Sequence, residues 1–172
     1  MAVSNEKEHT VMATDATKAA RAQKAYNDLC THLTACGWKY DRHDEDKVIT
    51  LTMRGIDLPM ELILAIKEEQ EVICLYSPIR PTPPKEKRTE IGMAVNMANY
   101  AVIFGSFMYD AYDRDLQWHA TLPYRDNSIT QNQVHYLVMA SCAVIDRYSA
   151  WFMMLGKGNV TLKQFYEFSK KL

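Results

Sequence analysis

Glycine is scarce in this chain, at 6 of 172 residues, and no stretch of the sequence is glycine-rich. Gly105 and Ser106 stand inside an alternating stretch and lack the Lys-Ser or Lys-Thr pair that completes a phosphate-binding loop. The pattern Gly-x-Ser-x-Gly, which exposes the nucleophile of α/β-hydrolases, is also missing. These absences exclude the enzyme classes that depend on such loops.

The chain also lacks an excess of either charge and a long hydrophobic run. Its formal net charge is -1 and its pI is about 6.5, whereas a surface for nucleic acid normally shows as a basic excess. No run approaches the roughly 18 apolar residues of a membrane-spanning helix, and the first residues do not follow the pattern of a secretion signal. We therefore expect a cytoplasmic protein that binds neither nucleic acid nor membrane.

The composition is that of one ordinary globular domain. Hydrophobic residues make up 48% of the chain and charged residues 24%, so a core can form without disulfide bonds or structural metals. The four cysteines are therefore expected to be buried free thiols. The polar opening predicts a flexible tail over residues 1–15, and the single domain follows over residues 16–172.

Hydrophobic periodicity predicts an α+β fold. Apolar residues recur at helical spacing in residues 17–36, 85–100 and 128–155, and again in a short stretch after Thr161. Alternation with period two predicts strands at residues 38–42, 47–54, 60–67, 103–110 and 116–122, and a uniformly apolar stretch predicts a further strand at residues 72–76. Short turns join successive strands, so we expect an antiparallel sheet of two meanders with helices packed on it. The order is a helix, three or four strands, a helix, two strands and a long helix, with a short C-terminal helix.

Local signals refine this layout. Ser128 with Gln131, and Thr161 with Gln164, have the spacing of capping boxes at the starts of the last two helices. Residues 72–76 are apolar at every position, which predicts an inner strand that is covered on both faces.

Cys30, His32 and Cys36 are the nearest approach to a metal motif. On a helix His32 and Cys36 share a face, but Cys30 points elsewhere and no second pair of ligands is near. The acidic runs at residues 44–46 and 110–115 lack the glycine and distal glutamate of a calcium loop, and suit solvated turns. We expect no metal site and no cofactor.

A cysteine nucleophile is the remaining catalytic candidate. Cys142 could act with His119 or His135, but its place in mid-helix among small and aliphatic residues is typical of a core thiol. We predict no catalytic residue and no enzymatic activity. The alternative is a small-ligand-binding protein, or an enzyme whose site is assembled from scattered residues such as His119, Tyr109 and Asp110.

Ten methionines lie largely on the apolar elements. The second predicted helix is apolar over an arc too wide to be buried on one sheet face, which suggests a dimer or partner surface. We expect a homodimer that uses Ile91, Met93 and Met97 of this helix with Phe107 and Tyr109 of the following strand.

Three stretches resemble the YbjN family of bacterial proteins. They are Gly55-Ile-Asp-Leu-Pro-Met-Glu-Leu, Asn96-Met-Ala-Asn-Tyr-Ala-Val-Ile-Phe-Gly-Ser-Phe-Met-Tyr-Asp and Leu116-Gln-Trp-His-Ala-Thr-Leu-Pro, with an Asp146-Arg-Tyr in the last long helix. Together these stretches cover roughly residues 16–155. The most distinctive phrase is the Gly-x-Phe-x-x-Asp that begins at Gly105.

The resemblance implies a fold like that of the type III secretion chaperones and a dimer that binds polypeptides or tunes a regulatory pathway. The family's members are described as sensory transduction regulators, and no catalytic residues are carried over. Secretion chaperones are markedly acidic and have three strands before the second helix, so only the fold is transferred to this nearly neutral chain, not the export role. We expect a chaperone-like or regulatory module that binds a polypeptide partner in a groove of the sheet and first helix, with Ile63 and Ala65 among the contacts.

Overall fold

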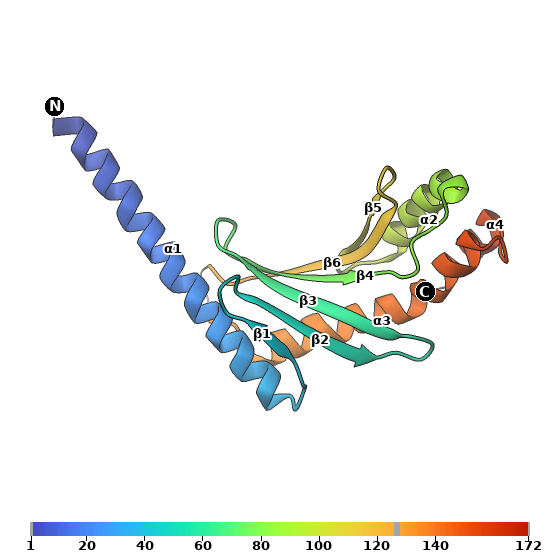
Figure 1. The fold of residues 1–172 in the computed structure, drawn as a ribbon, viewed down its shortest axis with the longest axis horizontal. Coiled ribbons are helices and arrows are strands. Elements are labelled where there is room, and N and C mark those ends of the chain that lie inside the picture. Colours follow the sequence, from blue (N-terminus) through green and yellow to red (C-terminus); the bar gives the residue numbers. More distant parts are fainter. Residues whose placement is uncertain (1, 126–127, 172) are drawn as a thin grey trace.

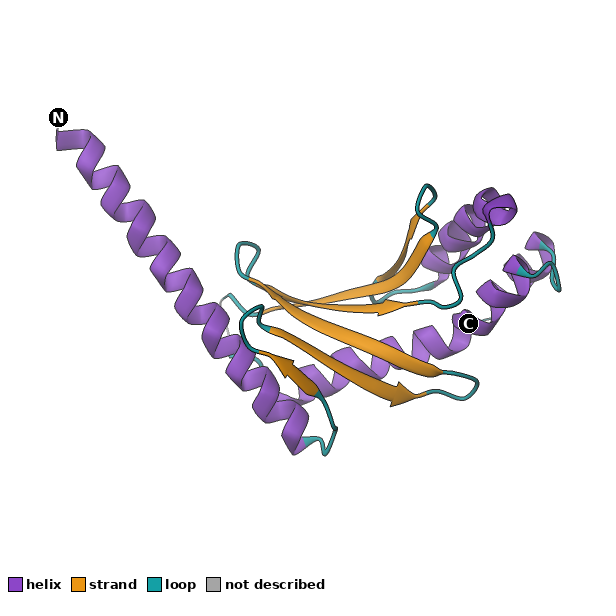
Figure 2. Cartoon of the chain, viewed as in Figure 1, coloured by secondary structure: helices purple, strands orange, loops and turns teal. Residues whose placement is uncertain are grey.

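In the computed structural model, which describes residues 2–125 and 128–171, an antiparallel sheet carries helices on one of its faces (Figure 1). The helices and strands follow one another along the chain in the predicted order, and Figure 2 shows them by type. The predicted α+β class is therefore confirmed.

The bounds of the elements agree with the periodicity to within a few residues, except at the start of the first helix. The strands are β1 (Asp41–His43), β2 (Val48–Arg54), β3 (Pro59–Lys67), β4 (Val72–Pro78), β5 (Ser106–Asp110) and β6 (Asp115–Pro123). The helices are α1 (Ala2–Ala35), the short 3-10 helix η1 (Lys85–Lys87), α2 (Arg88–Ala101), α3 (Gln131–Gly156) and α4 (Leu162–Ser169).

Within the described residues the six strands lie in the order β1-β2-β3-β4-β6-β5, and each neighbouring pair is antiparallel. β1 to β4 form a continuous meander. After β4, a proline-rich segment and α2 carry the chain to the far edge of the sheet, where β5 lies (Figure 1). β6 then returns between β5 and β4, which joins the two predicted meanders into one sheet.

Alternation along the strands decides which side chains meet the helices. We call the covered side the inner face, and its residues form the core with the apolar stripes of the helices. Leu29 of α1 and Leu155 of α3 are fully buried in this core, as are Leu62 and Trp118 of the sheet. The inner face consists of Ile49, Leu51, Leu62, Leu64, Ile73, Leu75, Phe107, Leu116, Trp118 and Ala120.

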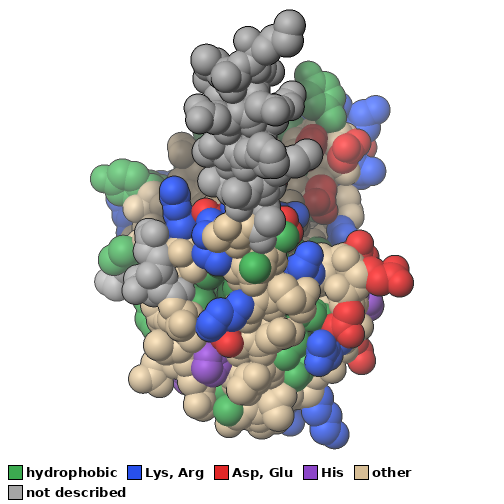
Figure 3. Space-filling view, turned by 90° about the vertical axis from the view of Figure 1, so that its left-hand side faces the viewer, with side chains coloured by type: hydrophobic (Ala, Val, Ile, Leu, Met, Phe, Trp, Pro, Cys, Tyr) green, Lys and Arg blue, Asp and Glu red, His purple; other side chains and the backbone are tan. Residues whose placement is uncertain are grey.

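Polar contacts fix α1 to the turns at one end of the sheet. The Arg21 guanidinium pairs with the carboxylate of Glu71, which is only 4% exposed, and Arg125 reaches the same carboxylate at 3.4 Å. The hydroxyl of Tyr26 donates to Asp44 at 2.8 Å. Figure 3 views this end of the molecule, where basic and acidic side chains lie close together. A buried carboxylate that lost these partners would be costly, so the ion pairs specify how α1 docks.

α1 begins at Ala2, well before the start predicted near residue 17. No proline or glycine interrupts residues 2–35, and alanine is frequent there, so no residue breaks the helix. The early turns extend beyond the sheet (Figure 1). That residues 1–15 form a flexible tail stays a prediction.

The helix caps agree with the sequence in one case of two. Thr161 and Gln164 form the expected capping box of α4. At α3 the box is instead Thr130 with Gln133, two residues later than predicted, because the helix begins at Gln131 and Ser128 lies ahead of it.

Candidate interaction site on the open face of the sheet

The face of the sheet opposite the helices, which we call the open face, has an apolar centre. Asp41, Thr50, Ile63, Tyr76 and His119 lie directly opposite one another in a row that crosses from β1 to β6. Directly paired residues of antiparallel strands project to the same face, so this row belongs to one surface. A second row beside it consists of Val48, Ala65, Cys74 and Thr121.

This surface has no covering layer among residues 2–125 and 128–171. Ala65 and Cys74 are 6% and 5% exposed, yet neither belongs to the core beneath the helices. Their neighbours on the open face shield them, and Ile63 and Tyr76 remain partly exposed. An apolar patch with a polar surround is typical of a surface that binds another molecule.

Tyr76 and His119 stack on this face, with ring centroids 5.0 Å apart. The Lys67 ammonium lies 5.7 Å from the centre of the Tyr76 ring. Burial raises the pKa of Tyr76 to about 12, and burial also lowers the pKa of His119 below its ordinary value. The imidazole is therefore neutral at pH 7, and its Nε2 is buried without a hydrogen-bond partner among the described residues.

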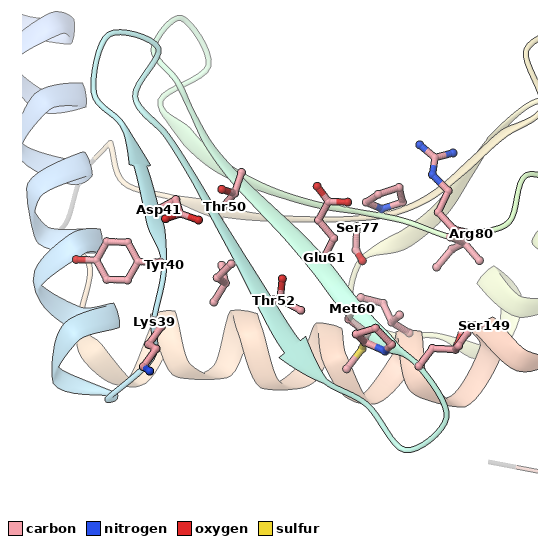
Figure 4. Close-up of a pocket in the computed structure, with 16 residues that line it drawn as sticks. Lys39, Tyr40, Asp41, Thr50, Thr52, Met60, Glu61, Ser77, Arg80 and Ser149 are labelled. Carbon is pink, nitrogen blue, oxygen red and sulfur yellow. The ribbon is translucent and has the colours of Figure 1, made fainter.

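The pairing of β3 with β4 stops partway along β3. The register ends at Ile63 opposite Tyr76, whereas β2 pairs with β3 as far as Pro59. Residues 59–62 therefore have a strand partner only on the β2 side. We call the gap between residues 59–62 and residues 77–80 the wedge (Figure 4).

Backbone groups of both strands face the wedge. The amide of Ile66 donates to the carbonyl of Lys47 at 3.1 Å on the β2 side. Because backbone groups of a strand alternate in direction, the N–H and C=O of Glu61 point away from β2. Just after β4, the amide of Ile79 donates to the carbonyl of Leu116 in β6 at 2.8 Å. The carbonyl of Pro78, one residue earlier, therefore points the opposite way, toward β3.

Two prolines explain why the pairing ends. Continuing the register would place Glu61 opposite Pro78, and Pro59 opposite Arg80. Proline has no amide hydrogen, so each of these pairs would lack a donor. The strands separate at the first pair that cannot form both of its bonds.

The wedge opens into a cavity of about 820 Å³ that reaches from the open face down to α3. Ile145 and Ser149 of α3 line it, together with Met60 and Ser77. Ser77 is 1% exposed, and its hydroxyl has no partner among the described residues. Figure 4 shows Ser77 among the residues that line the cavity.

The YbjN family model, described as "putative bacterial sensory transduction regulator", matches residues 26–154. This chain belongs to the YbjN family. The crystal structure of YbjN from E. coli, "a putative transcription regulator", has a similar fold, with a TM-score of 0.56 and 13% sequence identity over 78% of this chain and 90% of that one. No protein of curated description matches this chain.

The phrases that carry the YbjN resemblance serve the fold. At Gly55 an added Cβ would lie 2.3 Å from the carbonyl oxygen of Leu58 and 2.6 Å from the Asp146 carboxylate. At Gly105, where φ is +70°, a Cβ would lie 2.3 Å from the Trp118 ring. Trp118 comes from the third stretch, and Asp146 from the Asp146-Arg-Tyr of the last long helix, so the stretches that carry the resemblance lie close to one another.

Ile63 and Ala65, the predicted partner contacts, both lie on the open face. That they contact a partner stays a prediction. The sequence analysis missed Tyr76 and named His119 only as a catalytic candidate, although a signal for this surface existed. The uniformly apolar stretch at residues 72–76 predicted a strand covered on both faces, but helices cover only one of them.

The predicted dimer residues do not form one surface. Ile91 is 0% exposed and Phe107 is 2% exposed, because α2 and β5 use these side chains to join the core. Their side chains are therefore not available to a partner, which corrects the expectation for these two residues. Met93 is 50% exposed, while Met97 and Tyr109 are partly buried.

The alternative cluster of His119, Tyr109 and Asp110 is not assembled. Ser106 pairs with His119 on the open face, and Tyr109, three residues later in β5, projects to the inner face. The Asp110 carboxylate instead accepts hydrogen bonds from the amides of Tyr112 and Asp113 in the β5–β6 turn.

The metal candidates are also separated. Cys30 is buried, whereas the His32 ring bonds the carbonyl of Ile129 at 2.9 Å and Cys36 is partly exposed. Among residues 2–125 and 128–171, no group of three His, Cys, Asp or Glu side chains could hold a metal ion.

The catalytic candidate Cys142 is buried in α3, and burial raises its pKa to about 11. A thiol with a raised pKa is a poor nucleophile at neutral pH. Of its two proposed partners, His119 lies on the open face and His135 stacks on Trp38, with ring centroids 5.6 Å apart.

Proposed function

We propose that this YbjN-family regulator is a non-enzymatic interaction module that binds a polypeptide segment on its open face. The observation that carries the proposal is the apolar centre of that face, which no helix of the described residues covers. Ile63, Tyr76 and Val48 offer adjoining apolar surface, and Thr50 and Thr121 provide a polar rim. Protein-binding surfaces have this arrangement of an apolar centre and a polar rim.

The Tyr76–His119 stack is the anchor in this proposal. A stacked aromatic pair presents a large, rigid contact area, and its polar groups can bond a bound backbone. A chaperone-like or a regulatory role would use the same surface, since both act by holding a segment of another protein.

The proposal includes a cellular location. The four cysteines are free, which supports a reducing, cytoplasmic location. Of the described residues, none belongs to a helix long and apolar enough to cross a membrane.

Met93 and Tyr100 are 50% and 96% exposed on α2, and this surface supports a homodimer. Sedimentation velocity decides between a dimer and a monomer, and Met93→Glu is expected to dissociate the dimer.

Selection from a phage-displayed library of short random peptides tests the proposed function. The recovered peptides are synthesised and titrated against the wild type and Ile63→Glu by fluorescence anisotropy. A charge at the centre of the open face should weaken binding by about tenfold or more. Asn132→Glu, an exposed change at the start of α3, is the matched control and should bind normally. Recovery of no binding peptide, or equal affinity for Ile63→Glu, would contradict the proposal.

A further inference from the structure

The wedge is a gap in the sheet that no part of residues 2–125 and 128–171 closes. Ile63 and Tyr76 form the last pair between β3 and β4. Pro78 and Pro59 each lack the amide hydrogen that the next two hydrogen-bonded pairs would need. The N–H and C=O of Glu61 consequently face the cavity without a strand partner. Backbone groups in such a position require water or another backbone to satisfy them.

Two buried serine side chains line the cavity at this gap. Ser77 is among the residues that line the cavity (Figure 4), but it is only 1% exposed, and its hydroxyl is shielded from solvent and has no partner among the described residues. A buried hydroxyl without a partner is destabilising, so a ligand group that reaches it and forms a hydrogen bond with it strengthens binding. Ser149 of α3 adds a second hydroxyl to the lining.

The charges at the mouth indicate what kind of side chain the site would accept. Glu61 and Asp41 line the cavity, and neither has an ion pair among the described residues. Arg80, on the opposite side, is already paired with Asp115 at 3.5 Å. A basic side chain beside Glu61 would therefore meet unpaired negative charge.

We propose that the wedge binds a short extended polypeptide segment that adds to β3 as an antiparallel strand at Glu61. The segment directs a hydroxyl- or amide-bearing side chain at Ser77 and a basic side chain at Glu61. The inference rests on the proposed function and specifies its mode of recognition, which is strand addition to an open edge. The cavity of about 820 Å³ lies within the range of about 300–1,000 Å³ typical of binding pockets.

The choice of a strand over a compact ligand follows from the backbone. Glu61 offers a donor and an acceptor on the same side of β3, the pattern with which an antiparallel strand pairs. The three-stranded part β1-β2-β3 ends there as an edge, and β4 is held away by its own pairing with β6. An extended segment alternates its side chains, so one faces Ser77 and the next faces the open side with Glu61.

Amide hydrogen exchange measured by NMR, with the peptides recovered from the phage library, tests this mode. At saturation, exchange of the Glu61 amide should slow by about tenfold or more, because it gains a hydrogen bond. The amide of Ile63, already paired with Tyr76, should not change. Peptides that bind while the Glu61 amide exchanges as fast as before would overturn strand addition and leave the open-face function standing. If no peptide binds at all, that result contradicts the proposed function itself.

A pair of proline variants gives an independent measurement. Glu61→Pro removes the amide that the added strand needs, without breaking a bond to β2, and should weaken peptide binding by about tenfold or more. Arg54→Pro is the matched control. Arg54 is an exposed residue of β2 outside the lining of the cavity, and its amide likewise points away from the β2–β3 ladder, so this variant should bind as the wild type does. Circular dichroism confirms that both variants fold, and equal loss of affinity in the two would also overturn the inference.

Discussion

The carboxylate of Asp146 on α3 accepts a hydrogen bond from the backbone amide of Ile56, with an oxygen–nitrogen distance of 2.8 Å. Ile56 lies in the turn between β2 and β3, so this bond joins the long helix to the end of the β2–β3 hairpin. The approach is close because Gly55 has no side chain. The hairpin carries Glu61 and Pro59, so the same contact positions one wall of the wedge.

Replacing Gly55 by alanine is expected to destabilise the fold by about 1–3 kcal/mol, because the Cβ would overlap atoms that must then move. The atoms concerned are the Leu58 carbonyl oxygen at 2.3 Å and the Asp146 carboxylate at 2.6 Å. Urea unfolding followed by tryptophan fluorescence measures the change. Asp146→Ala should cost less, about 1 kcal/mol, since water can replace the lost acceptor at an exposed turn.

Gly92→Ala is the matched control for that experiment. Gly92 lies within α2, and its added Cβ would meet only the Tyr109 ring, at 3.9 Å. Alanine in a helix interior should stabilise the protein by about 0.5–1 kcal/mol. Destabilisation of similar size in both variants would mean that the close approach at Gly55 is not the cause.

A second glycine makes a contact of a different kind. Gly105 has a positive φ of +70°, and a Cβ added to it would lie only 2.3 Å from the Trp118 ring. We expect Gly105→Ala to cost about 3 kcal/mol, because left-handed strain adds to an overlap with a fully buried ring. Gly158 has a φ of +76° and open space around it, so Gly158→Ala should show only the strain, about 1 kcal/mol. Equal costs in the two variants would rule out the contact with Trp118.

Periodicity was sufficient to predict the fold because the inner face alternates cleanly. Ile49, Leu51 and the residues opposite them on β3 repeat with period two, and the helices repeat with period 3.6. The start of α1 was misplaced because a polar, alanine-rich segment without proline or glycine can be either a tail or a helix. Sequence alone does not decide between them when the segment lacks an apolar stripe.

The site was predictable only in part. The position of Ile63 and Ala65 on the open face could be predicted, because they alternate with the core residues of β3. The wedge was not found, because it depends on which residues of β3 and β4 face one another. Pro59 and Pro78 are far apart in sequence, and only the register shows that each occupies a position where a donor is needed.

The outer edge of β5 is protected by Asn99. Its side-chain amide donates to the carbonyl of Phe107 at 2.9 Å, and its oxygen accepts from the Phe107 amide at 2.7 Å. Asn99→Ala should therefore cost about 1–3 kcal/mol and leave an unpaired strand edge that promotes association. Static light scattering should detect larger species than in the wild type. Asn96→Ala, an exposed change on the same helix, should cause neither effect, and an Asn99→Ala protein that matches it would contradict the role of Asn99.

The neutral state of His119 makes stability depend on pH. Burial lowers its pKa in the folded protein, whereas the unfolded chain has the ordinary value of about 6.5. The unfolded state therefore binds more protons as the pH falls below about 6.5, and the free energy of unfolding should decline from there through the folded pKa. The contribution is fully present above about pH 6.5 and is absent from His119→Asn, whose unfolding free energy should change less over the same interval. NMR titration of the ring in native buffer and in urea provides the direct measurement, and equal pKa values in the two states would contradict the prediction. Because the same ring stacks on Tyr76, protonation would also place a positive charge on the open face, so binding of the selected peptides should weaken over the same pH interval.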